Sequence, residues 1–376
     1  MKIKEILKQE KASDIINELK SKRFIDQPDK DTAAKELDPL EHDVFDTNKR
    51  PNKRIKVDTE DSEYDQGPSD EAGFTYEPVA RIGLALQKLI VKRAVAFLFG
   101  NPVELNAETE NDKQLSVLRA VRRVMFDVKE KSLNRQIALE VFSSTEVAEL
   151  WYPVEKKNNS YGFKSEFKLR CAVLSPLLGD TLYPYFDGSG DMVAFSREYS
   201  TIDNKKAKHT FFETYTDEMH IKWEKDSEGY KVVEGYPKEN VLGKIPIVFG
   251  SQPQVEWADV QVLIDRLEKL LSNFADTNDY HASPKIFVQG EVVGFGKKGE
   301  SGAIIQGDKD ATAEYLSWAN APESVKLEID TLLRMIYTIS QTPDISFETV
   351  KGLGAISGVA LKLLFMDAHL KVADHQ

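Results

Sequence analysis

The apolar residues of this chain change their spacing along the sequence, and that change limits the folds the chain can adopt. From Glu146 to about Phe249, short segments such as "EVAELWYPVE" and "HTFFETYT" alternate apolar and polar residues, which is typical of strands with one buried face. Turn sequences such as "FDGSGD" and "EKDSEGY" separate these segments, so we expect an antiparallel meander. From Trp257 the apolar residues recur every three or four positions, which predicts a long amphipathic helix.

Helices are also expected on both sides of this region. Residues 81–143 have apolar residues at helical spacing, and a further helix begins near Pro322 and Glu323, residue types that helix starts favour. Between this helix and the one that follows Trp257 lies a short β-rich insertion. A sheet region combined with helices in this order predicts an α+β fold. At 376 residues, the chain is long enough for two or more lobes.

Charge and cysteine content narrow the function classes. A net charge of −12 argues against a protein that binds nucleic acid through a basic surface. The single cysteine, Cys171, lies in a strand-like segment, where we expect a core thiol rather than a nucleophile. The most apolar helix, in residues 82–100, is interrupted by Gln87, Lys88, Lys92 and Arg93, so we expect no membrane span.

The motifs of catalysis are absent from the sequence. Gly294, Gly296 and Gly299 match GxGxxG, but "ESGAIIQGD" follows and reads as a strand, so a hairpin turn is the better interpretation than a dinucleotide site. The sequence contains no GxxxxGK[ST], GxSxG or HExxH, and its six histidines lack metal-ligand spacing. We expect no enzyme activity, no cofactor and no metal.

Residues 26–80 are polar, with a basic run at 49–57 and seven acidic residues between Asp58 and Glu71. The run is either a nucleic-acid arm or part of a solvated surface segment, and we favour the second interpretation. Residues 1–80 are therefore expected to form a partly flexible polar arm.

Three segments resemble the portal proteins of tailed bacteriophages, of the siphovirus type. They are "LALQKLIVKRAVAFLFGNPVEL", "GKIPIVFGSQPQVEWADVQVLIDRLEKLLSNFADT" and "TPDISFETVKGLGAISGVALKLLFMDAHLK". The three occur in the order found in that family, and the resemblance covers about residues 80–376.

The resemblance implies a portal fold with a β-rich wing, two stem helices flanking a small α/β clip, a tunnel loop and the start of a long wing helix. Its parts would be a wing at 81–250, stem helices at 251–280 and 319–341, a clip at 281–318, a tunnel loop at 342–357, and the start of the long wing helix at 358–376. The family continues beyond that helix, so we expect the chain ending at Gln376 to be a fragment or a natural truncation.

In function, the resemblance implies a structural subunit of a ring, usually of twelve copies, at one capsid vertex of the virion. Double-stranded DNA would pass through the ring during packaging and ejection. The expected partners are the terminase large subunit, scaffolding and major capsid proteins, and a head-completion or connector protein. Synthesis is expected in the cytoplasm of the host bacterium.

The resemblance also implies roles for particular residues. The DNA-facing tunnel loop would contain Ser346, Glu348, Lys351, Gly352 and Gly354. The stem would pack through Trp257, Leu263, Leu267 and Leu270, and the clip would dock its partners through Lys297 and Lys298. Residues 251–280 carry six acids against Arg266 and Lys269, a net charge of −4, so we expect an anionic stem that repels DNA phosphates.

Two alternatives from other function classes stay open on the sequence. One is a β-rich interaction or scaffold protein of a non-viral assembly. The other is a nucleic-acid-processing enzyme that uses the basic run at 49–57.

Overall fold

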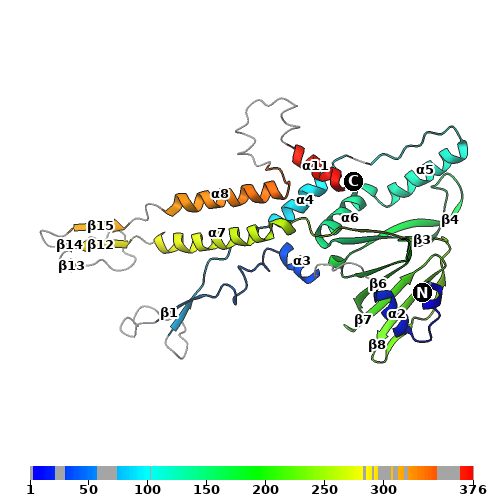
Figure 1. Ribbon diagram of the computed structural model, residues 1–376, viewed down its shortest axis with the longest axis horizontal. Coiled ribbons are helices and arrows are strands. Elements are labelled where there is room, and N and C mark those ends of the chain that lie inside the picture. The colour runs from blue at the N-terminus through cyan, green and yellow to red at the C-terminus, as the bar shows by residue number, and fades with distance from the viewer. Residues whose placement is uncertain are drawn as a thin grey trace. The chain divides into compact units, whose positions relative to one another are not determined.

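A computed structural model describes residues 3–21, 30–56, 74–101, 103–282, 285–289, 292–294, 306–307, 312–316, 321–344 and 365–375. The chain forms two compact units (Figure 1). The sheet unit contains residues 1–38, 85–259 and 340–376, and the hairpin unit contains residues 39–84 and 260–339. The chain therefore passes between the units after residues 38, 84, 259 and 339, so each unit combines segments that are far apart in the sequence.

Two antiparallel sheets occupy the region of alternating apolar residues. Their strand orders are β11-β3-β4 and β10-β8-β7-β6-β5, and β9 also pairs with β8. This arrangement confirms the predicted α+β class, since helices and antiparallel sheets are both present. The strands are β3 (Glu146–Asn158), β4 (Ser165–Leu174), β5 (Thr181–Phe186), β6 (Met192–Ile202), β7 (Lys208–Tyr215), β8 (Met219–Asp226), β9 (Gly229–Val232), β10 (Lys238–Glu239) and β11 (Ile247–Ser251).

A buried cluster joins the two sheets. It contains Ala148, Leu150, Leu174, Leu182, Phe195, Tyr215 and Ile247, which come from strands of both sheets. Because successive side chains of a strand point to opposite faces, Ala194 lies on the other face of the six-stranded sheet from Phe195. The alternation in the sequence therefore corresponds to a sheet with two covered faces rather than one.

Two N-terminal helices cover that other face. They are α1 (Ile3–Ile6) and α2 (Ala12–Ser21), and their Ile6, Ile16 and Leu19 are buried against Phe212 and Trp223 of the sheet. At the edge of this contact, Lys20 pairs with Glu198 and lies over the rings of Tyr183, Phe212 and Tyr230. The start of the predicted polar arm thus contributes to the core of the sheet unit.

Among the described residues, the sheet unit has five further helices, some of them in the predicted region 81–143. Helix α4 contacts both α6 and α11. Within the described ranges, no helix is long and apolar enough to cross a bilayer. These helices are α3 (Lys30–Leu37), α4 (Leu86–Leu98), α5 (Asp112–Asp127), α6 (Glu130–Ser144) and α11 (Met366–His375), and a short 3-10 turn spans Pro176–Leu178.

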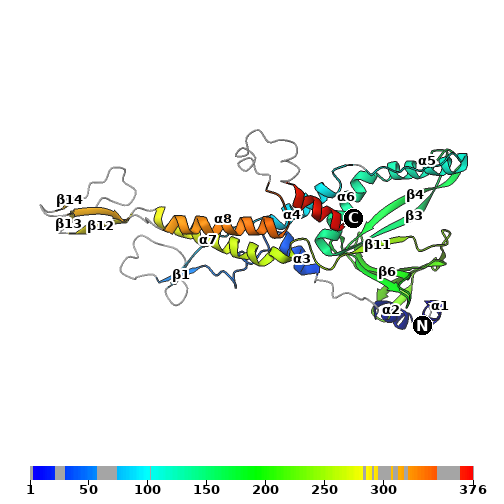
Figure 2. The ribbon, with the colours of Figure 1, turned by 45° about the horizontal axis from the view of Figure 1, so that its top comes forward.

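The hairpin unit is built on two long helices, α7 (Gln261–Ala282) and α8 (Ala321–Ile339). They pack along each other, and Arg266 of α7 pairs with Glu328 of α8 (Figure 2). A 3-10 turn at Ala258–Val260 precedes α7, so the helix begins at Gln261 rather than at 251 as expected. The intervening strands β12 (Lys285–Gln289), β13 (Val292–Gly294), β14 (Gln306–Gly307) and β15 (Thr312–Leu316) form the antiparallel pairs β12–β15 and β13–β14.

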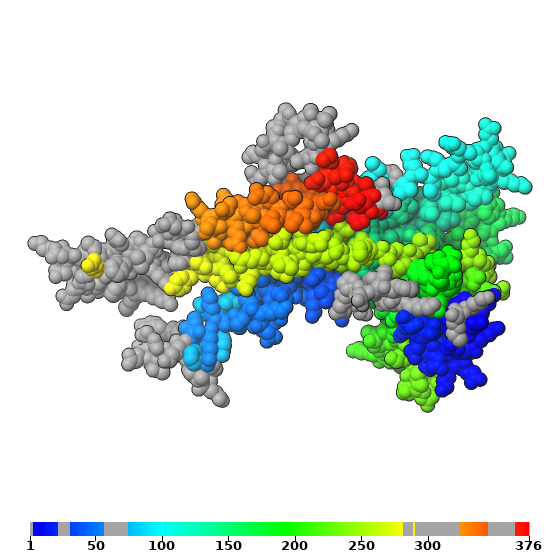
Figure 3. Space-filling model, in the orientation of Figure 1, coloured from blue at the N-terminus to red at the C-terminus, as the bar shows by residue number. Residues whose placement is uncertain are grey.

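Residues 39–56 and 74–84, here called the strap, run along α7 on the side away from α8 (Figures 1–3). The strap contains the antiparallel strands β1 (Lys53–Lys56) and β2 (Phe74–Glu77). Its last part lies against a row of polar residues of α7. The backbone N–H groups of Ala80, Ile82 and Leu84 donate to Asp276 (2.8 Å), Ser272 (3.0 Å) and Glu268 (2.7 Å).

The spacing of this row matches the spacing of an extended chain. Four residues of an α-helix rise about 6.0 Å, and two residues of an extended segment span about 6.6 Å. Acceptors four residues apart on α7 therefore meet every second N–H group of the strap. We call this arrangement the polar ladder.

The first part of the strap is fixed by charged and buried side chains. His42 Nδ1 lies 2.7 Å from Glu268 Oε1, and Arg50 donates to both Asn273 (2.7 Å) and Asp276 (2.6 Å). The strap also approaches itself closely, because a Cβ atom on Gly83 would lie 2.3 Å from the carbonyl oxygen of Pro39. The described part of the strap is therefore not the solvated surface segment that its polar sequence indicates.

Candidate functional site: the root of the α7–α8 hairpin

One candidate site of the sheet unit is formed by the segments just before α7 and just after α8, together with α4 and α11. The chain leaves the sheet unit just before α7 and returns to it just after α8. The described chain then ends at Asp344 and resumes at Phe365, immediately before α11. The predicted tunnel-loop residues Ser346, Glu348, Lys351, Gly352 and Gly354 lie outside the described residues, and so do Lys297 and Lys298.

One face of α4 holds both described ends that flank residues 345–364. Arg93 donates to the carbonyl oxygen of Pro343, on the side of α8. Phe97 packs on Phe365 with ring centroids 5.7 Å apart, and on His369 with centroids 6.1 Å apart. Arg93 and Phe97 are four residues apart, so they lie on the same face of the helix. The two ends are thus held by neighbouring side chains.

A buried lysine on α11 connects the segments that flank the hairpin. Lys371 Nζ lies 2.6 Å from Glu256 Oε2, just before α7, and donates to the carbonyl oxygen of Ser340 (3.0 Å), just after α8. The exposed fractions of the Lys371 and Glu256 side chains are 11% and 6%. One ammonium group therefore binds both the segment that precedes α7 and the segment that follows α8.

A second partner completes the site around Glu256. His375 Nε2 lies 3.0 Å from Glu256 Oε1, and the His375 ring packs on Phe142 with centroids 4.6 Å apart. Burial raises the pKa of Glu256, but the hydrogen bond from His375 and the charge of Lys371 outweigh this effect and hold the pKa below its ordinary value. Glu256 is thus a buried carboxylate in its charged form.

The four predicted stem-packing residues differ in their surroundings. Leu267 is fully buried, Leu270 is buried and Leu263 is half-buried, all on α7. Trp257 is also fully buried, but it precedes α7 and belongs to the sheet unit, where its indole N–H donates to Glu36 (2.7 Å). The packing of the assembled stem through these residues stays a prediction.

The anionic face expected for residues 251–280 is smaller than the count of acidic residues indicates. Glu256 is held by Lys371, Glu268 by His42 and Leu84, and Asp276 by Arg50. The exposed charged residues of α7 are Arg266, which pairs with Glu328, together with Lys269 and Asp279. The described residues therefore do not present a net charge of −4 per chain on an exposed stem surface.

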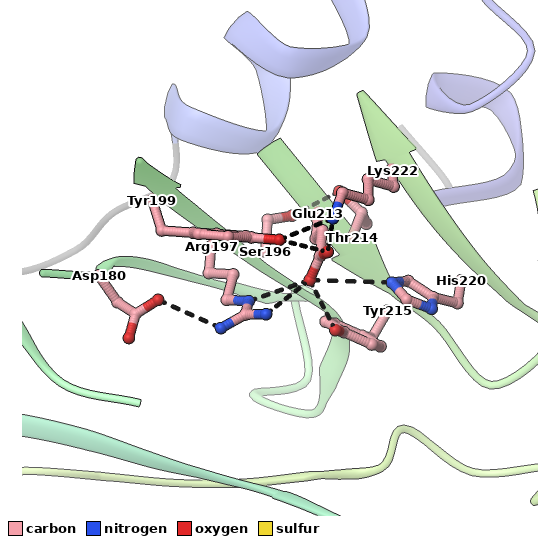
Figure 4. A network of polar contacts seen from close by, with 9 residues as sticks. All are labelled: Asp180, Ser196, Arg197, Tyr199, Glu213, Thr214, Tyr215, His220 and Lys222. Carbon is pink, nitrogen blue, oxygen red and sulfur yellow. Dashed lines mark hydrogen bonds and ion pairs between the residues drawn. The ribbon is translucent and has the colours of Figure 1, made fainter. Parts of the chain in front are cut away.

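A second cluster of charged groups lies within the six-stranded sheet (Figure 4). Its centre is Glu213 on β7, which accepts hydrogen bonds from Arg197 (2.9 and 3.0 Å), Tyr199 (2.8 Å) and Tyr215 (2.8 Å). Lys222 Nζ lies 3.1 Å from the same carboxylate. Arg197 also bonds Asp180 (3.3 Å), so two cations meet two acids in the sheet.

The ionisation of this cluster argues against acid–base catalysis. Burial raises the pKa of Glu213, but Arg197 and the two tyrosine hydroxyls lower it to about 2 overall. Burial lowers the pKa of His220, which stacks on Tyr215 with centroids 4.2 Å apart, to about 4. A general acid or base works best with a pKa near the operating pH, and neither group meets this condition at neutral pH. The cluster is suited to fixing the strands of the sheet.

Two further observations bear on the enzyme and metal alternatives. Burial raises the pKa of the half-buried Cys171 thiol to about 12, so the nucleophilic thiolate is scarce at neutral pH. Among the residues that the structure describes, no group of three His, Cys, Asp or Glu side chains is placed to hold a metal ion.

The comparison with known protein families decides the assignment. A family model described as phage portal protein, SPP1 Gp6-like, matches residues 52–376. The chain belongs to the phage portal protein family. No curated protein matches the chain.

The portal family is structural, and it implies a ring assembly associated with the capsid of the virion. This assignment agrees with the resemblance found in the sequence and argues against the non-viral scaffold and enzyme alternatives. The match begins at residue 52, so α1–α3 and the strap residues His42 and Arg50 lie outside the matched part of this portal subunit.

Sequence reasoning missed most residues of the hairpin root and of the Glu213 cluster. For Lys371 the sequence did hold a signal. Ala368, Lys371 and Val372 are spaced three and four residues apart, so they share one face of α11, and a lysine on a face with apolar neighbours suggests a buried partner. For Glu213 there was no such signal, because its partners Arg197 and Lys222 come from neighbouring strands whose register the sequence does not state.

Proposed function

We propose that this portal subunit forms a ring whose central passage conducts double-stranded DNA during packaging and ejection, and whose clip region receives the terminase and head-completion proteins. The observation that carries the proposal is the match to the phage portal family over residues 52–376. The paired helices α7 and α8 support it, because they provide a stem-like hairpin with a short-stranded region between them.

The hairpin root supports a DNA-contacting role for the segment that follows α8. Arg93, Phe97 and Lys371 hold the described residues on both sides of residues 345–364. A loop that contacts moving DNA requires firm ends, so that force on the loop does not unravel the neighbouring helices. Within that segment, Lys351 offers a cation for a weak contact with phosphate, and Gly352 and Gly354 permit backbone adjustment.

The smaller free charge of α7 changes the proposed mechanism of sliding. Strong repulsion by an anionic wall is not required if the wall carries few free charges of either sign. DNA is bound tightly when many phosphates are neutralised at once, and a passage that offers few cations avoids this. We propose that low cation density, rather than a high negative charge, lets the duplex slide.

Two measurements test this function. Negative-stain microscopy and native mass spectrometry of the purified portal protein should show annular particles of many copies, and a protein that stays monomeric under all assembly conditions would contradict the ring. In a DNA-packaging assay, Lys351→Glu should lower genome filling more than it lowers ring yield. Normal filling by Lys351→Glu rings would overturn the role of Lys351.

Docking at the clip has its own test. Lys297→Glu and Lys298→Glu should weaken binding of the terminase large subunit to assembled rings without lowering ring yield. Unchanged terminase binding by the double variant would contradict the docking role of these lysines.

A further inference from the structure

The N-terminal helices α1 and α2 rest on the outer face of the six-stranded sheet (Figure 1). The residues that the two helices bury are aliphatic, and beneath them the sheet presents Phe212 and Trp223, which are 0% and 2% exposed. One charged side chain of α2 takes part in the same contact. The Lys20 side chain is 28% exposed, and its ammonium group lies among side chains of the sheet. The chain thus places a cation at the edge of an aromatic surface.

Three aromatic rings surround the Lys20 ammonium group. Its Nζ atom lies 5.4 Å from the ring centroid of Tyr183, 5.3 Å from that of Phe212 and 5.8 Å from that of Tyr230. A cation within about 6 Å of a ring centroid is attracted by the negative face of the ring. The ring planes are inclined by 44° between Tyr183 and Phe212 and by 69° between Phe212 and Tyr230. The three rings therefore approach the cation from different directions.

A carboxylate completes the surroundings of this ammonium group. Glu198, whose side chain is 23% exposed, pairs with Lys20 and accepts a hydrogen bond from the hydroxyl of Tyr230 (3.4 Å). Burial and the charge of Glu198 raise the pKa of Tyr230 to about 12, so the hydroxyl keeps its proton at neutral pH. We call the four sheet residues Tyr183, Glu198, Phe212 and Tyr230 the ammonium cage.

The strand register gathers the ammonium cage from distant positions of the sequence. Glu198 on β6 lies directly opposite Phe212 on β7. Tyr183 on β5 lies opposite Ser196, which is two positions before Glu198 and therefore on the same face of β6. Tyr230 is contributed by β9, which pairs with β8. The cage is thus a product of the folded sheet, formed by four of its strands.

The dimensions of the cage define the ligands that it can accept. Centroid distances of 5.3–5.8 Å leave room for methyl groups on the nitrogen, because carbon atoms in contact lie about 3.5–4.0 Å apart. Aromatic rings attract a methylated ammonium group as well as a protonated amine, since methylation keeps the charge. An ordinary ion pair differs, because trimethylation removes every N–H donor that could reach a carboxylate.

We propose that the ammonium cage is a binding site for lysine and N-methylated lysine side chains, and that Lys20 is its resident ligand. The occupied cage helps to hold α2 on the sheet, because a helix of ten residues is not stable without a packing surface. Loss of the cation weakens this attachment and makes Phe212 and Trp223 more accessible. The inference does not depend on the proposed ring. The ligand precedes the family match at residues 52–376, whereas the cage lies within it.

Chemical replacement of the Lys20 side chain tests charge and shape separately. Lys20→Cys is prepared in a Cys171→Ser background and alkylated to carry a 2-aminoethyl, a 2-(trimethylammonio)ethyl or a 3,3-dimethylbutyl group. The third group has the shape of the second but no charge. Hydrogen exchange of the α2 amides, measured by mass spectrometry, reports how firmly the helix is attached. The two cationic forms should protect α2 alike, and the neutral form should protect it roughly five- to thirtyfold less.

Variants of the cage and of a second lysine provide matched comparisons. Tyr230→Phe keeps the ring and should keep the protection, whereas Tyr230→Leu removes one wall and should lower it by about fivefold or more. Lys4→Met removes an exposed pair with Glu218 from the same pair of helices, and protection of α2 should change by less than about threefold. Exchange of β3 and β4 should stay unchanged throughout, which shows that the sheet unit is folded.

Two results would overturn the inference. Equal protection by the dimethylbutyl form would show that shape alone holds the helix. Loss of protection in the trimethylammonio form, with protection kept in the aminoethyl form, would assign Lys20 to an ordinary ion pair with Glu198.

Discussion

The imidazole of His42 and the carboxylate of Glu268 form a hydrogen-bonded pair sealed from solvent, with side-chain exposures of 3% and 1%. The same carboxylate oxygen accepts the backbone N–H of Leu84. Glu268 thus fixes both the beginning and the end of the strap on α7. A single acidic residue of the helix organises segments separated by about forty positions of the chain.

Glu268→Ala should therefore destabilise the hairpin unit. The substitution removes the carboxylate that the buried His42 ring and the part-buried Leu84 N–H share, at roughly 1–3 kcal/mol each, so the free energy of unfolding should fall by about 2–6 kcal/mol. Urea denaturation followed by circular dichroism measures this change. Asp279→Ala, an exposed acid on the same helix, should stay within about 0.5 kcal/mol of the parent. Equal effects of both substitutions would contradict the burial argument.

Gly83→Ala should weaken the strap for steric reasons. Its Cβ atom would lie 2.3 Å from Pro39 O and 2.9 Å from a ring carbon of Phe45, so the backbone must shift. We expect a loss of about 1–3 kcal/mol in the free energy of unfolding. Gly188→Ala is the matched control, because no atom lies within 4 Å of its Cβ position. Indistinguishable melting curves for the two variants would show that the strap does not pack at this point.

Lys371→Met should loosen the hairpin root, since it leaves the Glu256 carboxylate buried without its ammonium partner. Removing one member of a buried pair costs about 3–5 kcal/mol, and replacing both by apolar residues costs much less. The double variant Glu256→Met/Lys371→Met should therefore recover part of the loss. Hydrogen exchange of residues 340–344 reports the local effect, which should exceed that in the strands of the sheet unit.

Acid should act on the same pair in the parent protein. The pKa of Glu256 lies below its ordinary value of 4.5, so its charged form stabilises the fold above that pH. This contribution should be lost as the pH falls below 4.5 and through the lowered pKa. The pH profile of the free energy of unfolding should be flatter for Glu256→Gln than for the parent in this range. Parallel profiles would mean that Glu256 does not contribute.

Glu213→Gln should destabilise the six-stranded sheet, because Arg197 and Lys222 lose their buried counter-charge. We expect a loss of about 3–5 kcal/mol at neutral pH. Since the pKa of Glu213 is about 2, its stabilising effect should begin to fall only below pH 4.5 and be lost near pH 2. Glu228→Gln, at an exposed pair with Lys231, serves as a control that should have little effect. A neutral Glu213→Gln result would remove the structural role of the cluster.

Leu267→Asp should prevent assembly, because it buries a carboxylate at a fully buried position of α7. Val262→Asp, on the same helix but 77% exposed, is the matched control for the added charge. Ring yield by size-exclusion chromatography should collapse for Leu267→Asp and not for Val262→Asp. A normal yield for Leu267→Asp would contradict the packing assigned to α7.

The regular parts of this fold could be predicted from the sequence, because apolar spacing reports directly on burial. The alternating region and the helices α7 and α8 were found in this way. Strand β5 was not predicted, since Pro184 interrupts its pattern although it pairs with Phe195 in the sheet. The role of the strap was also missed, because its contacts with Glu268, Ser272 and Asp276 are polar and leave no apolar periodicity. The spacing of those three residues on one side of α7 is the signal that could have revealed it.

The net charge counted over residues 251–280 overestimates the free acidic groups for a related reason. A sum over residues counts Glu256, Glu268 and Asp276 as free acids, whereas Lys371, His42 and Arg50 occupy them in the structure. These partners come from parts of the chain far away in sequence. A net charge read from one segment therefore overstates what that surface presents to a ligand.

The polar ladder sets its own maximum length. Its helical and extended repeats differ by about 0.6 Å per rung, so three rungs accumulate a mismatch of only about 1.2 Å, which hydrogen-bond geometry tolerates. Several more rungs would drift out of bonding range. Two unlike polymers can thus run side by side only briefly, and a one-residue insertion between Ala80 and Leu84 would put every later donor out of phase with its acceptor.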